Sequence, residues 1–170
     1  HALLALLGLG TPALRDRLPL PDRALLARAG ALCRGSAPAL ALADLLGDFF
    51  AVPVAVRQFV PGWYVVEEEQ RSRLGRTACE LGTSLTLGER VQVAQTRFRL
   101  RLGPVAWGRF QEFLPTGAAF GPLVSLTRLA AGPEHDFDLQ LALAVAGVPR
   151  MRLAAPAQGG AAWLGWSTWL

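Results

Sequence analysis

Hydrophobic residues in the first third of the chain recur with the period of an α-helix. After Pro21, apolar positions three and four residues apart continue to residue 33, and a second such pattern follows Pro38, with Asp44 and Asp48 on its polar face. Because a helix buries one stripe and solvates the other, the sequence predicts two amphipathic helices that face a core. Their apolar stripes consist of Leu25, Leu26, Ala29, Leu32 and Cys33, and of Leu42, Leu45, Leu46, Phe49 and Phe50.

From residue 52 the pattern changes to the period of a β-strand. Three valines alternate with other residues over 52–59, and Pro61-Gly62 marks a turn. Period two is typical of a strand with one buried face, so we expect a strand here and a return strand over 63–66. Residues 67–76 are polar and charged, and we expect the domain's mobile loop within 67–88.

Two more strands are expected after residue 90. Val91 and Val93 form a short run, and residues 97–102 alternate strictly between Arg and an apolar side chain. The second run therefore has one apolar and one cationic face, and Gly103-Pro104 is expected to end it. Pro104 would then occupy the first position of a helix. That helix has an apolar stripe of Ala106, Phe110, Phe113 and Leu114 and ends at Pro115-Thr116-Gly117.

The last part of the chain predicts a helix, a hairpin and a docked tail. A helical pattern covers residues 122–131, alternation over 139–145 indicates a strand, and a turn at 147–149 leads into a return strand at 150–153. Three of the five Trp residues fall within 163–169. Such a density is typical of buried anchors, so this segment is expected to be an extended strand or a docked segment.

This order of elements lacks the regular βαβα alternation of a doubly wound sheet and favours an α+β fold. We expect an N-terminal helical lead-in over residues 1–50, followed at 51–170 by an antiparallel or mixed sheet with two packed helices. The chain starts at His1 without an initiator Met or a basic n-region, so we interpret this start as the cut edge of a larger protein.

Composition narrows the class of protein. Hydrophobic residues make up 52% of the chain and the mean hydropathy is +0.31, enough for a substantial core. The longest stretches without charge are interrupted by Gly and Pro, so neither predicts a membrane span. Cys33 and Cys79 are far apart in the sequence, which argues against a disulfide framework or a cysteine metal site and fits a reducing cytoplasm.

The positive charge is a weak argument for nucleic-acid binding. All 17 basic residues are Arg, yet the formal net charge is only +4. The isoelectric point of 10.4 is inflated because every cation is Arg. A stripe of Arg97, Arg99 and Arg101 could follow a phosphate backbone, bind a protein partner through carboxylates, or be an ordinary solvated sheet face. These three interpretations remain open on the sequence.

Catalytic patterns are weak. Glu67, Glu68 and Glu69 are adjacent and cannot all face one pocket, and His135 follows a turn without recognisable metal-ligand spacing. The sequence has no nucleophile elbow, phosphate loop or dinucleotide fingerprint. We therefore expect no enzyme, no catalytic residue, no cofactor and no metal. A binding module for anions or nucleic acid is the alternative, and a hydrolase built around Glu67 and His135 is a distant third.

Several runs, taken in order, resemble the TssG/ImpH/VasB family of type VI secretion. The most specific are the run from Arg97 to Pro104 and the Trp-Ser-Thr-Trp ending at 166–169. They are accompanied by Leu45 to Val54, Gln58-Phe59, Trp63, Leu87-Gly88 with Arg90, and Phe110 with Phe113 to Pro115. Pro115-Thr116-Gly117 departs from the family's usual Pro-Gly-Gly, and the resemblance covers the C-terminal half of the family's length.

The resemblance implies a non-catalytic subunit of a cytoplasmic baseplate docked at the inner face of the bacterial inner membrane. Such a subunit joins two copies of a TssF-type subunit and is held by trimers of a TssK-type adaptor, with a TssE-type subunit and the VgrG spike as further contacts. Nucleic acid and direct membrane insertion are not expected. The residues that we expect to bind partners are Glu67, Glu68, Arg71 and Arg73, the three arginines of the stripe, and Trp163, Trp166 and Trp169, together with the loop 82–88.

Overall fold

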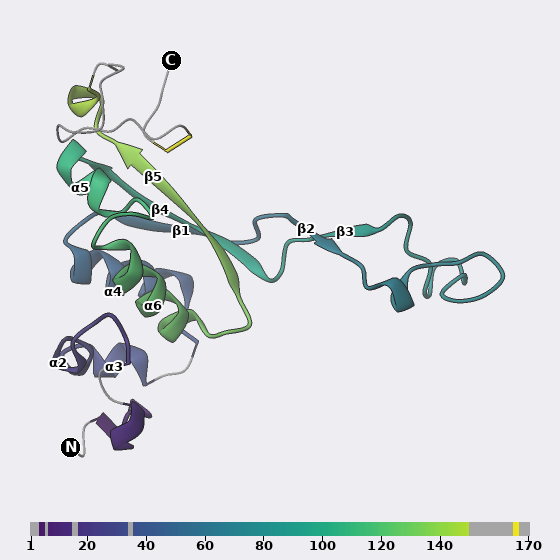
Figure 1. Cartoon of the computed structure of the whole chain (residues 1–170), viewed down its shortest axis with the longest axis horizontal. Helices are drawn as coiled ribbons and strands as arrows, with labels where there is room; N and C mark the ends of the chain where they lie inside the picture. The colour runs from purple at the N-terminus through teal and green to yellow at the C-terminus, as the bar shows by residue number, and fades with distance from the viewer. Residues whose placement is uncertain (1–3, 6, 15–16, 34–35, 150–164, 167–170) are drawn as a thin grey trace.

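The structure is a computed structural model that describes residues 4–5, 7–14, 17–33, 36–149 and 165–166. Its fold is α+β, as the sequence predicts (Figure 1). The helices are α2 (Asp22–Leu26), α3 (Ala29–Leu32), α4 (Ala39–Phe50), α5 (Trp107–Glu112) and α6 (Phe120–Ala131), with 3-10 turns η1 (Pro12–Leu14), η2 (Glu68–Gln70) and η3 (Val145–Gly147). The strands are β1 (Val54–Arg57), β2 (Gly62–Val65), β3 (Arg90–Val93), β4 (Arg97–Val105) and β5 (Asp136–Leu143).

The first predicted helix is two short helices. The pattern that begins at Pro21 is interrupted at Arg28, whose backbone angles, φ −122° and ψ 17°, are not helical. Leu25 and Leu32 are nevertheless both buried in the main core. The apolar spacing therefore predicted which side chains are buried. It did not predict the break, because Leu25 on α2 and Leu32 on α3 reach the same core from two separate short helices.

The second predicted helix, α4, is confirmed. Its apolar stripe packs into the core, and both Asp44 and Asp48 are exposed. The helix ends where Ala51 adopts a left-handed conformation, φ 52°, which turns the chain directly into β1. Helix α4 and helix α6 lie side by side against the sheet (Figure 1).

The main sheet is mixed, with strand order β1-β4-β5. β1 pairs antiparallel with β4, whereas β5 pairs parallel to β4 after a crossover through α5 and α6. Parallel neighbours require such a long connection, which here supplies the covering helices. Alternate residues of β4, namely Phe98, Leu100 and Leu102, are buried beneath them. Full burial of one such side chain contributes roughly 1.5–3 kcal/mol to folding.

Gly103-Pro104 does not end the strand, contrary to the prediction. β4 continues to Val105, the register with β5 shifts between Leu102 and Val105, and the following helix starts only at Trp107. Gly103 has φ +108°, and a Cβ there would lie 2.3 Å from the carbonyl oxygen of Ala142. This glycine therefore lets β4 and β5 approach each other through the irregularity, where a side chain would separate them.

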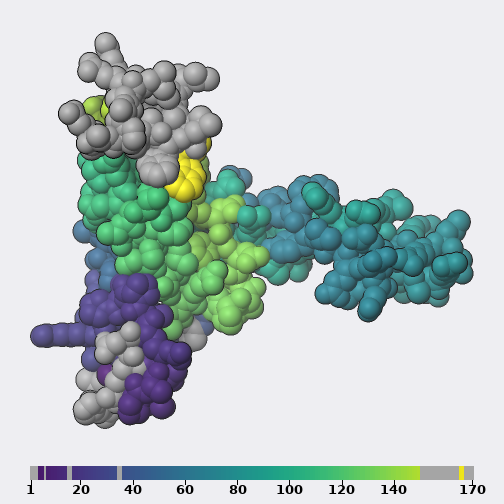
Figure 2. Space-filling model, in the orientation of Figure 1, coloured from purple at the N-terminus to yellow at the C-terminus, as the bar shows by residue number. Residues whose placement is uncertain are grey.

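The prediction that residues 63–66 return along the first strand is wrong. β2 pairs with β3, and the two form a separate antiparallel sheet. Residues 62–93, which we call the arm, project from the rest of the molecule, which we call the body (Figures 1 and 2). Residues 66–89 form the tip of the arm. The alternation along the chain identified the strands correctly, but it carries no information about the partner of each strand.

The strand predicted over 139–145 starts earlier and ends earlier than expected. β5 covers Asp136–Leu143, and η3 follows it. The predicted return strand at 150–153 lies outside the described residues. Within the described ranges, no helix has both the length and the apolar character that a membrane crossing requires.

Candidate protein-interaction surface

The arm exposes an unusual share of the large apolar side chains. Of fourteen such exposed side chains among the described residues, seven belong to the arm. Leu74, Leu81 and Leu87 in the tip are 97%, 88% and 84% exposed. The full set in the arm is Trp63, Val65, Leu74, Leu81, Leu85, Leu87 and Val91. Such a share of exposed apolar side chains makes the arm a candidate for a surface that another molecule covers.

The ribbon of the arm places two of these side chains on one face. In the β2–β3 register, Trp63 lies opposite Gln92 and Val65 lies opposite Arg90, and all four residues are exposed. Successive residues alternate between the faces of a ribbon, so Trp63 and Val65 share a face. A two-stranded ribbon without further packing is only marginally stable in water. A solvated face that carries Trp63 and Val65 beside Gln92 and Arg90 is therefore a candidate contact surface.

The charged residues predicted in the tip are largely engaged with one another. Arg73 Nη2 donates to Glu68 Oε1 at 2.8 Å, and Arg71 donates both to Glu89 Oε1 at 3.2 Å and to the backbone oxygen of Val66 at 3.0 Å. Glu67 is exposed beside them. Exposed ion pairs of this kind contribute little to stability. The charges were visible in the sequence, whereas the adjacent exposed leucines were missed.

The arginine stripe is divided by one carboxylate. Arg97 and Arg99 both donate to Asp138 on the neighbouring strand β5, whereas Arg101 is exposed. Burial disfavours the charged form of Asp138, but the hydrogen bonds and charges of Arg99 and Arg97 outweigh this effect and hold its pKa below the ordinary value of 3.8. Asp138 thus partly neutralises the charges of Arg97 and Arg99 within the sheet. This weakens the argument for a phosphate-binding stripe.

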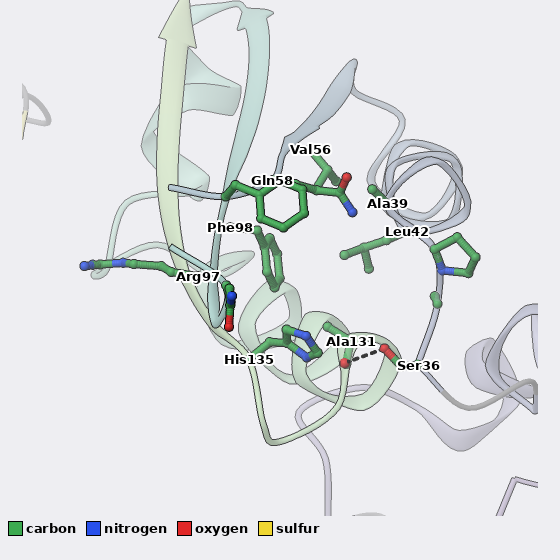
Figure 3. Close-up of a pocket in the computed structure, with 13 residues that line it drawn as sticks. Ser36, Ala39, Leu42, Val56, Gln58, Arg97, Phe98, Ala131 and His135 are labelled. Carbon is green, nitrogen blue, oxygen red and sulfur yellow. Dashed lines mark hydrogen bonds between the residues drawn. The ribbon is translucent and has the colours of Figure 1, made fainter. Parts of the chain in front are cut away.

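A pocket of about 330 Å³ lies in the body, between the start of α4, the end of α6 and the strands β1 and β4 (Figure 3). Leu42, Val56 and Phe98 provide apolar lining, and His135 lies near Ser36 and Ala131, whose backbone oxygen accepts a hydrogen bond from Ser36. The side chain of Arg97 is directed away from the pocket in Figure 3. The polar side chains that line this pocket are too few and too scattered to constitute an acid/base pair.

His135 and Glu67 are not brought together as a catalytic pair. His135 lies just before β5 in the body, with Nδ1 3.4 Å from Glu134 Oε1, whereas Glu67 lies in the tip of the arm. In the part of the chain that the structure describes, no group of three or more His, Cys, Asp or Glu side chains is placed to hold a metal ion.

One residue of the predicted tryptophan anchor can be located. Trp166 lies beside a pocket of about 280 Å³ and is itself 44% exposed. That pocket is also lined by Phe110, Phe113, Leu114, Pro115, Phe120, Leu139 and Leu141. Trp163 and Trp169 lie outside the described residues. The other described residues that line this pocket belong to the body.

Comparisons with known proteins place these features in a family. No curated protein matches the chain significantly. A chain of a solved structure, described as that of the type VI secretion system TssK-TssF-TssG baseplate subcomplex determined by cryo-electron microscopy, has the same fold, with a TM-score of 0.80 at 21% identity. The likeness covers 98% of this chain and 70% of that one. The family model for type VI secretion TssG matches residues 1–170. This chain belongs to the TssG family of type VI secretion.

Proposed function

We propose that this chain is a structural, non-catalytic subunit of a type VI secretion baseplate and that the arm is a docking element for a neighbouring subunit. The observation that carries the proposal is the projection of a narrow ribbon whose tip leaves Leu74, Leu81 and Leu87 almost fully in solvent. A monomer gains nothing from this exposure, whereas an assembled subunit can bury the leucines against a partner.

The partners follow from the family and from the shared fold. The solved structure with this fold is of a complex with TssK and TssF, which supports TssF-type and TssK-type subunits as the neighbours of this chain. Two TssF-type copies, TssK-type trimers, a TssE-type subunit and the VgrG spike complete the proposed set. The corresponding location is the cytoplasmic side of the bacterial inner membrane, within the assembled baseplate.

Two further surfaces are proposed as secondary contacts. Arg101 is exposed on the outer face of the main sheet and is available for a carboxylate of a partner. The segment around Trp166 is proposed to anchor either the body or the TssF-type subunit. The tip charges Glu67, Glu68, Arg71 and Arg73 are proposed to act by shaping the arm and by lining the rim of its contact.

Co-expression of the complete protein with the TssF-type and TssK-type subunits of the same genome tests the proposal. Light scattering after size-exclusion chromatography would report the mass of the complex. We expect wild type to form a heteromeric complex and the triple variant Leu74→Asp, Leu81→Asp, Leu87→Asp to lose a partner. The matched control is Leu40→Asp, because Leu40 is 75% exposed but lies on α4 in the body. An intact complex with the triple variant would refute docking through the arm.

A further inference from the structure

The arm and the main sheet are two sections of one interrupted hairpin. The pair Arg57 and Arg99 belongs to the β1–β4 ladder, and the pair Gly62 and Val93 belongs to the β2–β3 ladder. Four residues, 58–61, separate these pairs on one side and five residues, 94–98, on the other. The register therefore shifts by one residue between the two ladders, as it does at a β-bulge. We call these two segments the junction.

The backbone of the junction is constrained on the side that enters the arm. Phe59 has φ +57°, an uncommon conformation for a residue with a large side chain. The next residue, Val60, is buried, and its amide donates to the backbone oxygen of Arg97 at 3.1 Å. This hydrogen bond links the two segments of the junction. A side-chain contact between the arm and the body can add to it in setting the direction of the arm.

Tyr64 supplies that contact. It belongs to β2 in the arm, and its hydroxyl donates to Asp136 Oδ2 at 3.2 Å, in the first residue of β5. The same hydroxyl accepts a hydrogen bond from Thr96 Oγ1 at 3.1 Å, and Thr96 in turn accepts the amide of Asp136 through its backbone oxygen at 2.8 Å. One phenol thus connects the arm, the junction and the body.

The space for this contact depends on Gly62. A Cβ at this position would lie 3.1 Å from Nη1 of Arg97 and 3.3 Å from Cε2 of Tyr64. Gly62 is buried although it starts the arm. The absence of a side chain therefore allows the Tyr64 ring and the Arg97 guanidinium to close over the first residue of the ribbon, on the side where the phenol reaches Asp136.

We propose that Tyr64 is a positioning residue that fixes the direction of the arm relative to the body through Asp136 and Thr96. A partner then meets an arm that already has its bound direction, and the ordering cost of association falls. The consequence for assembly rests on the proposed function of the arm as a docking element. The fixed direction itself is a property of this chain and needs no partner.

The two cysteines of the sequence allow a direct measurement. Cys33 lies at the end of α3 in the body and Cys79 lies in the tip of the arm, and both are exposed. Nitroxide labels on these two residues report the distribution of body-to-tip distances by pulsed electron spin resonance. We expect Tyr64→Phe, which keeps the ring and removes the hydroxyl, to broaden or shift the distribution. Trp63→Phe is the matched control, since Trp63 lies on the other face of the same strand.

Substitutions at the acceptor distinguish positioning from a general loss of structure. Asp136→Ala removes the acceptor and should reproduce the broadening, whereas Asp136→Asn keeps an acceptor oxygen and should restore most of the wild-type distribution. Thermal unfolding of each variant reports whether the body remains folded. A distance distribution that is unchanged in both Tyr64→Phe and Asp136→Ala, with the body folded, would overturn the proposal.

The assembly measurement separates this inference from the proposed function. If Tyr64 positions the arm for docking, Tyr64→Phe should weaken the complex on the order of a few-fold to tenfold, the range expected for loss of a net hydrogen bond. Unchanged affinity with a broadened distance distribution would refute its part in assembly. If the triple leucine variant also assembles normally, docking through the arm fails, while the distance distribution still decides whether Tyr64 fixes the arm.

Discussion

The body of this molecule contains the buried core, whereas the arm leaves most of its large apolar side chains exposed. In the body, Leu100 and Leu102 of β4 are fully buried between strands and helices. In the arm, Leu74 and Leu81 lie almost entirely in solvent. The hydrophobic effect acts equally on both sets, so we propose that they differ in when they are buried. The body completes its burial on folding, and the arm is proposed to complete it on assembly.

The largest effect is expected from removing a core side chain of the body. Leu100→Ala should lower the free energy of unfolding by about 2–5 kcal/mol, because the closely packed core cannot fully close the cavity that the side chain leaves. Chemical denaturation monitored by circular dichroism measures this loss. A loss below about 1 kcal/mol would mean that the core around Leu100 is not closely packed, and the contrast between the body and the arm would not hold.

A glycine of the body should be nearly as sensitive. Gly103→Ala should cost about 3 kcal/mol, because its Cβ would meet the Ala142 carbonyl in a backbone conformation that suits glycine. Gly108→Ala in α5 is the control, since nothing lies within 4 Å of its added Cβ and alanine favours a helix. Thermal unfolding should show opposite shifts for the two variants, and equal shifts would contradict the close approach of β4 and β5.

The carboxylate on the outer sheet face should have an intermediate, pH-dependent effect. Its pKa is lowered in the folded state, so Asp138 contributes stability that is present above the ordinary value of 3.8 and is lost as the pH falls through the lower folded value. Asp138→Asn should cost about 1–2 kcal/mol at pH 7 and progressively less in acid. Urea denaturation between pH 2 and 7, with exposed Asp44→Asn as the control, measures the difference, and a pH-independent gap would contradict the ion pairs with Arg97 and Arg99.

The smallest effect on stability is expected in the arm. Leu81→Ser should change the free energy of unfolding by less than about 0.5 kcal/mol, because the side chain is already 88% exposed. The same denaturation experiment serves as the measurement. A loss comparable to that of Leu100→Ala would show that the tip is packed in solution, and the contrast between arm and body would disappear.

Local periodicity predicted the elements that the body buries. The helix α4 and the strand β4 each bury one face, and the spacing of their apolar residues follows that face. The spacing therefore identified both the type of element and its buried side. The α+β class followed from their order. The break at Arg28 and the passage of β4 through Gly103-Pro104 were missed, because both depend on backbone geometry and on the close approach of a neighbouring element.

The arm was less predictable because its structure is set by pairing over a long loop. Trp63 and Val65 satisfy a strand pattern equally well next to β1 or next to β3, and the register shift in the junction has no periodicity of its own. The tip charges were recognised as exposed. A sequence feature that could have revealed the surface is the recurrence of Leu74, Leu81 and Leu87 among Gly, Ser, Thr and Arg, where nothing nearby can bury them.

The pairing of β2 with β3 also has a consequence for how the sequence of such a protein can vary. Everything between Val65 and Arg90 enters and leaves through one pair of adjacent strands, so the main sheet meets the tip only through that pair. Exchange of residues 66–89 for another sequence would leave the core of the body untouched. Under the proposed docking, residues 66–89 could therefore be exchanged to change the neighbouring subunit that this chain binds, while the fold of the body stays the same.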